Sequence, residues 1–273
     1  MTYLRKHTIL PSEHGAWIWW IGPLLIGAAA AGSWSTDVLV LAAAAFAAFL
    51  LRQPATILVK VASRRRPARQ LGPALVWGVV DLILLASAAA VLVARGHAQI
   101  LVLAVPGALV FAWHSWLVFR REERGQMGIE IVGAGVLALT APAAYWVCGG
   151  ASPVLPWLLW LLSWLQSAAS IVLVTFRLAY RKLPAMPRLG QRTRDGRRTL
   201  LYHGFNGLLA VALALAGDIP NLMAGAFLLM LVDAIAAVAR PPLGRPPTKI
   251  GVRQLIASAL FVLLSVGGFL PSW

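Results

Sequence analysis

The chain has 273 residues, of which 60% are hydrophobic and 12% are charged, and its formal net charge is +15. Soluble domains carry roughly 25% charged residues, so this composition excludes an ordinary soluble protein and indicates a membrane protein. The positive charge is explained by the membrane topology, in which basic residues remain on one side, and we expect no nucleic-acid partner. The single cysteine, Cys148, excludes an internal disulfide.

Apolar stretches alternate with short loops along the whole chain and predict an all-α, polytopic helical membrane protein. We expect one integral membrane domain, residues 1–273, with about nine transmembrane helices, most near the roughly 20 residues that cross a bilayer. In chain order, the predicted spans are 16–32, 36–51, 71–94, 98–118, 128–148, 154–176, 200–216, 219–239 and 252–271.

Basic residues are concentrated on one side of these predicted spans. Every Lys and Arg except Arg95 lies in the N-terminal tail or in or beside the gaps 52–70, 119–127, 177–199 and 240–251. Because positive loops stay in the cytoplasm, this pattern predicts a cytoplasmic N-terminus and an external C-terminus.

Segment 52–70 is the most basic part of the chain, with six basic residues and no acidic one. We expect it to lie at the cytoplasmic face and, with 177–199, to cover a cavity lined by cations. Polar residues inside spans are costly, and here most fall in the cytosolic halves of their helices, which favours one cytosol-facing cavity. They are Glu13, His14, Asp81, His114, Glu130, Thr140, Gln166, His203, Asn206 and Asp233.

Each of these polar residues also has a purely structural interpretation. Asp81 can pair with an arginine or a backbone group between helices, and Asp233 can pair with Arg240. His114 fits a packed histidine better than a metal or haem ligand. Haem bound by His14, His114 and His203 stays open as an alternative, although sequence alone does not bring these residues together. The run 64–66 fits an anchor to anionic lipid headgroups.

No motif for nucleotide binding, zinc proteolysis or serine hydrolysis occurs in the chain. We therefore expect no metal site and no cofactor, and the residues leave open whether the protein is an enzyme.

Three short runs resemble the YwiC-like family of bacterial membrane proteins. They are PSEHGAW at residues 11–17, RQP at 52–54 and PPTKIGVRQ at 246–254. The resemblance extends over most of the chain, and its first run is the most specific. It implies a multi-pass protein of the bacterial inner (plasma) membrane.

A more distant resemblance is to the UbiA superfamily of intramembrane prenyltransferases, whose nine-helix bundle covers its cavity with the loops after helices two and six. FRREER at 119–124 and YRKLPAMP at 180–187 are similar to stretches of that superfamily. Its two Asp-rich motifs hold Mg²⁺ on a prenyl pyrophosphate. Here the corresponding runs, 52–60 and 177–181, contain no carboxylate, so ordinary metal-dependent prenyl transfer is not expected.

Cations in place of those carboxylates can bind phosphate directly. The sequence therefore predicts a site for an anionic amphiphile, such as an isoprenoid or lipid phosphate, with membrane lipids as partners. A non-catalytic accessory or assembly protein and a transporter remain alternatives, and the oligomeric state is not predicted. Candidate acid or base groups are Glu13, His14 and Glu130, and candidate ligand-binding residues are Arg52, Gln53, Lys60, His114, Arg120, Arg177, Arg181 and Lys249.

Overall fold

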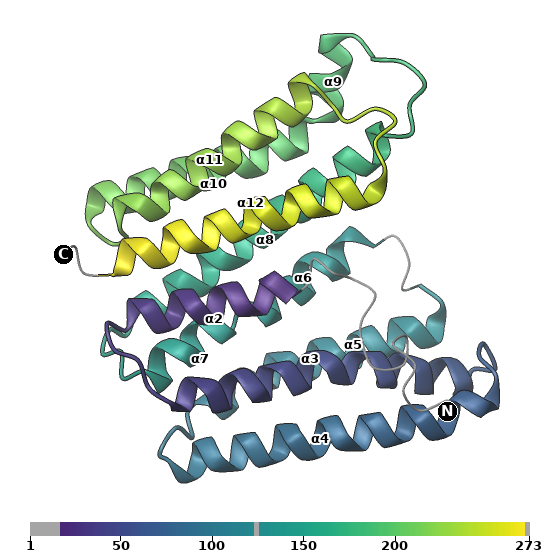
Figure 1. The fold of residues 1–273 in the computed structure, drawn as a ribbon, viewed down its shortest axis with the longest axis vertical. Coiled ribbons are helices and arrows are strands. Elements are labelled where there is room, and N and C mark those ends of the chain that lie inside the picture. Colours follow the sequence, from purple (N-terminus) through teal and green to yellow (C-terminus); the bar gives the residue numbers. More distant parts are fainter. Residues whose placement is uncertain (1–16, 123–125, 271–273) are drawn as a thin grey trace.

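The computed structural model describes residues 17–122 and 126–270, and this part of the chain is helical, without a strand. The long helices lie side by side as a bundle (Figure 1). In order, the elements are α2 (Ile18–Ala30), α3 (Asp37–Ala62), η2 (Ala68–Gln70), α4 (Leu71–Ala94), α5 (Ile100–Arg120), α6 (Met127–Leu137), α7 (Thr140–Val147), α8 (Leu155–Tyr180), α9 (Leu189–Asp195), α10 (Arg197–Ala216), α11 (Asn221–Ala239) and α12 (Pro247–Phe269).

Eight helical segments of the described chain are long and apolar enough to cross a membrane, with α6 and α7 together counted as one. The predicted polytopic helical membrane fold is thereby confirmed. The first predicted span corresponds to α2, whose 13 described residues are fewer than the roughly 20 that a crossing needs. A total of nine spans therefore stays a prediction.

Helix α3 corrects the expectation that residues 52–70 form a loop. The helix continues to Ala62 and contains Pro54. It ends where Ser63 donates its hydroxyl to the Val59 carbonyl at 2.8 Å and Arg64 takes a left-handed φ of 55°. Long basic side chains let a helix extend beyond the hydrocarbon, because their stems stay on apolar surface while the charges reach water. Charge alone therefore did not mark the end of this helix.

The fifth predicted span is broken between α6 and α7. The Leu139 N–H donates to the Val136 carbonyl, so the Gly135 carbonyl loses its usual helical donor. The Trp160 indole replaces that donor, with its Nε1 2.8 Å from the Gly135 oxygen. Beyond the break, the Thr140 hydroxyl donates to the Leu137 carbonyl at 2.9 Å. Breaks within membrane helices need such substitutes, because lipid offers no hydrogen bonds.

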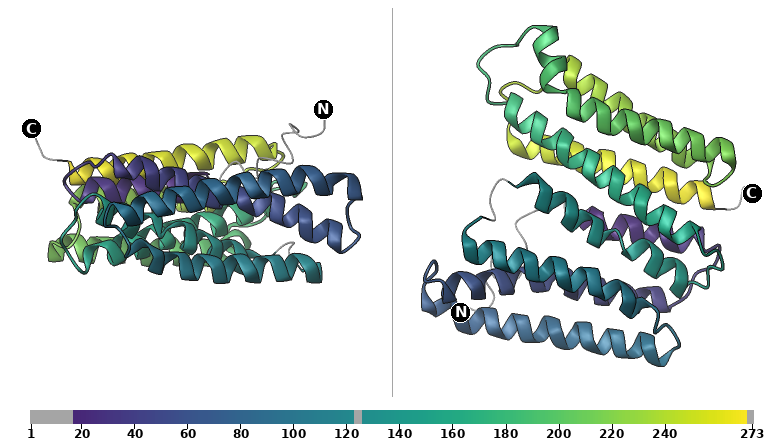
Figure 2. Two further views of the ribbon diagram at one scale, coloured as in Figure 1. Left: turned by 90° about the horizontal axis from the view of Figure 1, so that it is seen from below. Right: turned by 180° about the vertical axis from the view of Figure 1, so that it is seen from behind.

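Helix α2 joins two groups of helices. It packs against α7, α8 and α12, whereas α3–α4 and α10–α11 form antiparallel hairpins on either side (Figures 1 and 2). The closest approach to α7 is at Gly27, where an added Cβ would collide with the Ala141 backbone. Gly27 is thus a point where only glycine lets two backbones meet.

The basic loops lie at one end of the bundle, on the right of Figure 1, and Arg95 lies at the other end. Arg95 there forms an ion pair with Asp37 at the start of α3, and the His97 ring nitrogen lies 3.0 Å from the same carboxylate. The one basic residue outside the charge pattern is therefore paired locally.

Candidate functional site

The residues predicted to bind a ligand fall into two groups in the structure. Glu13 and His14 lie outside the described residues. Arg52, Gln53 and Lys60 lie on α3 and are each partly buried. The expected convergence of all these residues is therefore not tested. The α3 residues form the first group, and the second group lies on α8 and α12.

Arg120 ends α5 on the surface of the protein. Its guanidinium carbon lies 5.3 Å from the centre of the Trp116 ring, and its Nε lies 3.7 Å from a Glu122 oxygen. This arrangement is a local surface cluster. His114, one and a half turns earlier on α5, is half-buried, and Glu130 on α6 is exposed.

The second group centres on Arg177, which was expected in a loop but lies within α8 and is only 2% exposed. Its Nη2 lies 2.8 Å from Asp233 on α11, and the other oxygen of that carboxylate lies 2.6 Å from the Nη2 of Arg253 on α12. Asp233 therefore joins three helices, and its observed partners replace the Arg240 that the sequence suggested. Two arginines face one carboxylate, so this ion cluster carries excess positive charge.

A chain of hydrogen bonds extends from the ion cluster into the bundle. The Nη1 of Arg177 donates to the Gln254 amide oxygen at 3.2 Å, and the Gln254 nitrogen donates to the Ser170 hydroxyl at 3.0 Å. Ser170 also accepts from the Gln166 amide nitrogen at 3.3 Å. At about 1.5 Å per helical residue, Gln166 lies roughly 16 Å deeper than Arg177.

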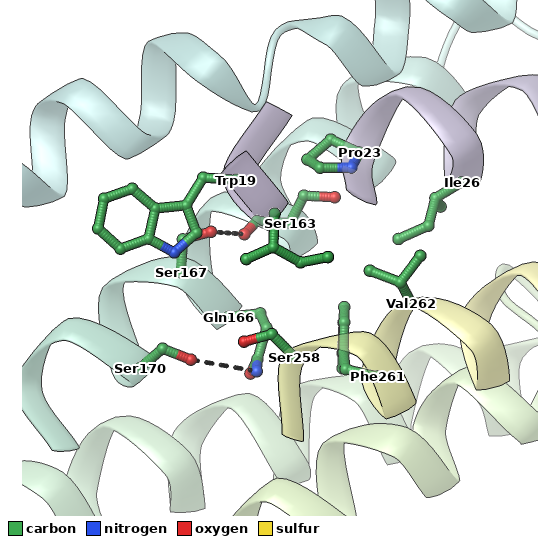
Figure 3. A pocket seen from close by; sticks show the side chains of 11 residues that line it. Trp19, Pro23, Ile26, Ser163, Gln166, Ser167, Ser170, Ser258, Phe261 and Val262 are labelled. Carbon is green, nitrogen blue, oxygen red and sulfur yellow. Dashed lines mark hydrogen bonds between the residues drawn. The ribbon is translucent and has the colours of Figure 1, made fainter. Parts of the chain in front are cut away.

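The chain of hydrogen bonds ends at a small cavity between α2, α8 and α12 (Figure 3). The cavity has a volume of about 20 Å³, enough for a buried water, which needs roughly 10–15 Å³ and two to four polar partners. The buried Ser163 hydroxyl and the Gln166 carbonyl oxygen lack a partner in the described structure. The residues that line this cavity are Ile18, Trp19, Pro23, Ile26, Ser163, Gln166, Ser167, Ser170, Ser258, Phe261 and Val262.

At the basic end, one face of α12 lines a surface depression of about 350 Å³. Lys249 and Arg253 provide its charge, and Val252 and Ile256 provide exposed apolar surface. Lys249 was predicted from sequence to bind a ligand. Arg253 lines the depression and also pairs with Asp233, so the depression borders the buried ion cluster. Arg181 lies one turn beyond Arg177, where its carbonyl accepts from Gly244.

Two further buried polar residues, His203 and Asn206, lie on α10, and Asn206 connects this helix to α8. A His203 ring nitrogen lies 2.8 Å from the Thr199 carbonyl, and the Asn206 amide donates to the Leu165 carbonyl on α8 at 2.9 Å. His203 is thus a packed, hydrogen-bonded histidine. Across residues 17–122 and 126–270, no three His, Cys, Asp or Glu side chains gather as a metal site.

Sequence reasoning named Arg177, Gln166 and Lys249 but missed Arg253, Gln254, Ser170 and Ser258. A signal was present, because the polar residues of α8 recur at helical spacing and so share one face. They are Ser163, Gln166, Ser167, Ser170 and Arg177. Their partners on α11 and α12 are more than 50 residues away, and sequence alone does not identify them.

Comparison with known proteins gives one family. No curated protein and no solved structure matches the chain, so the distant resemblance to the UbiA superfamily stays a prediction. The model of the family described as YwiC-like protein matches residues 10–145. This match covers α2 to α6 and most of α7, whereas the ion cluster on α8, α11 and α12 lies beyond it. Through this half of its length, the chain belongs to the YwiC-like family.

Proposed function

We propose that this membrane protein binds an anionic amphiphile, an isoprenoid or lipid phosphate, at the basic end of α12. The observation that carries the proposal is the charge of the site. Arg177 and Arg253 share the single carboxylate of Asp233, and Lys249 lines the same depression as Arg253. A bound phosphate would offset this excess positive charge.

The surroundings favour an amphiphile over a free anion. Val252 and Ile256 are 56% exposed each, so the depression offers apolar surface beside its cations. A phosphate seated between Lys249 and Arg253 would leave an attached hydrocarbon chain against this surface. Arg253 suits the headgroup, because a guanidinium donates two parallel hydrogen bonds to phosphate oxygens.

We expect this site to lie at the cytoplasmic face of a bacterial inner membrane. Its support is the distribution of basic loops, which lie at the same end of the bundle as Lys249 and Arg253 (Figure 1). The phosphate is held by cations in this arrangement, and binding should not need Mg²⁺.

Binding can be measured with purified protein in nanodiscs of neutral lipid, in the presence of EDTA. Farnesyl phosphate and phosphatidic acid are the probes, and farnesol and phosphatidylcholine are their uncharged or zwitterionic counterparts. We expect the phosphates to bind and the counterparts not to bind. Lys249→Ala and Arg253→Ala should each weaken binding at least tenfold, because each removes a direct phosphate contact.

Arg194→Ala is the matched control, because it removes a basic residue from α9 at the same end of the protein but away from the depression. It should leave binding unchanged. Equal losses in all three variants would indicate only general attraction to the basic end. Absence of binding would overturn the proposal in favour of a non-catalytic accessory protein. After reconstitution into closed vesicles, transport of the phosphate into the lumen would favour the transporter alternative.

A further inference from the structure

Helix α4 contains one charged residue, Asp81, about halfway along its length. Its side chain is buried, with the residue only 4% exposed. Within the part of the chain that the structure describes, its carboxylate has no hydrogen bond or ion pair. An unpaired charge is very costly in such surroundings, and a neutral carboxyl, which needs one acceptor for its proton, is far less so.

Helix α3 provides an acceptor at the matching depth. Proline lacks an N–H, so Pro54 cannot donate to the carbonyl of Leu50, four residues earlier. Leu50 is buried, with 6% of the residue exposed. A carbonyl left open inside a membrane needs a donor from a neighbouring element.

Two contacts set the register of the α3–α4 hairpin. At one end, Asp37 pairs with Arg95. Nearer the basic end, a Cβ on Gly78 would lie 3.8 Å from the Cβ of Pro54. Both contacts give the same antiparallel register, and it places Asp81 opposite Leu51, the residue after Leu50. The Leu50 carbonyl points along the helix toward this level.

We infer that Asp81 is a proton-binding site inside the membrane, and that its neutral carboxyl donates a hydrogen bond to the Leu50 carbonyl. Protonation completes the hydrogen bonding of the α3–α4 hairpin. Loss of the proton leaves a buried carboxylate facing an open carbonyl, both of them electron-rich, and loosens the hairpin.

Among the described residues, no other charge faces Asp81 from α3 or η2, the two elements that pack against α4. Between Asp37 and Lys60, the only charged residue of α3 is Arg52. At 3.6 residues per turn, Arg52 points about 160° away from Leu50 around the helix axis. Arg69 of η2 lies at the basic end, three turns from Asp81. A hydrogen bond to the backbone is therefore the interaction that the hairpin offers.

Chemical labelling tests the protonation. Dicyclohexylcarbodiimide reacts with protonated carboxyls in apolar surroundings, and we expect one adduct, on the peptide containing Asp81, in nanodiscs at neutral pH. Asp81→Asn should abolish the adduct. Asp37→Asn should retain it, because Asp37 is paired at the loop end of the hairpin.

A double-mutant cycle tests the partner. Asp81→Ala should lower the melting temperature by several degrees, whereas Asp81→Asn should not, because its amide can still donate to Leu50. In a Pro54→Ala background the restored N–H satisfies the Leu50 carbonyl, so Asp81→Ala should cost much less than it does beside Pro54. Absence of the adduct, or equal losses in the two backgrounds, overturns the proposal.

Discussion

Arg177 and Asp233 form an ion pair of 2.8 Å across 56 residues of sequence, and the arginine side chain is only 3% exposed. The pair holds α8 against α11, and Arg253 of α12 shares the same carboxylate. A buried guanidinium of this kind is tolerated only while its partner remains.

Removal of Asp233 should therefore be strongly destabilising. Asp233→Ala leaves Arg177 buried without a counterion, a change that costs about 3–5 kcal/mol. Thermal unfolding in nanodiscs measures the loss. Replacing both partners, as Arg177→Met with Asp233→Leu, should recover much of it. Arg253→Ala is the control and should cost no more than about 1 kcal/mol, because the Arg253 side chain is 60% exposed.

The contact between α2 and α7 should not tolerate a methyl group at Gly27. Gly27→Ala forces the two helices apart at the Ala141 carbonyl, and we expect a loss of about 1–3 kcal/mol, as for other overpacked cores. Gly225→Ala, in α11, has open space around its Cβ and should be neutral or slightly stabilising. Unfolding temperatures of the two variants compare them directly, and similar values would refute the close packing of α2 on α7.

The break between α6 and α7 should depend on Trp160. Trp160→Phe keeps most of the aromatic contact but removes the donor to the Gly135 carbonyl, and the unsatisfied carbonyl should cost about 1–3 kcal/mol. Trp157→Phe is the matched control from the adjacent turn, since the described structure gives its indole ring contacts but no hydrogen bond. Hydrogen exchange at the break should quicken in the first variant and not in the second.

The orientation in the membrane can be measured with single cysteines. Cys148 is buried, so Cys148→Ala provides a background for Asp218→Cys and Met186→Cys, which lie at opposite ends of the bundle. In intact cells, a membrane-impermeant maleimide should label the first and reach the second only after permeabilisation. The opposite pattern would reverse the orientation and place Lys249 and Arg253 outside.

The sequence by itself determined the membrane class and the number of long apolar segments after the first. These follow from composition and from runs of apolar residues, which are local properties and do not depend on neighbouring helices. The position of most Lys and Arg residues at one end of the bundle was also predicted, because these residues occur in alternate gaps between the apolar segments. The helix boundaries were predicted less well, because α3 and α8 both continue past the first basic residue, as far as Ala62 and Tyr180.

Only the tertiary structure decided which polar residues meet. Asp233 has Arg240 seven residues away in the sequence, yet it pairs with Arg177 and Arg253 because the packing of α8, α11 and α12 brings these side chains together. The depth of Asp81 was readable from its span, but its level with the Leu50 carbonyl needed the register of the hairpin. Contacts between distant helices depend on how whole helices pack, and no local pattern in the chain encodes them.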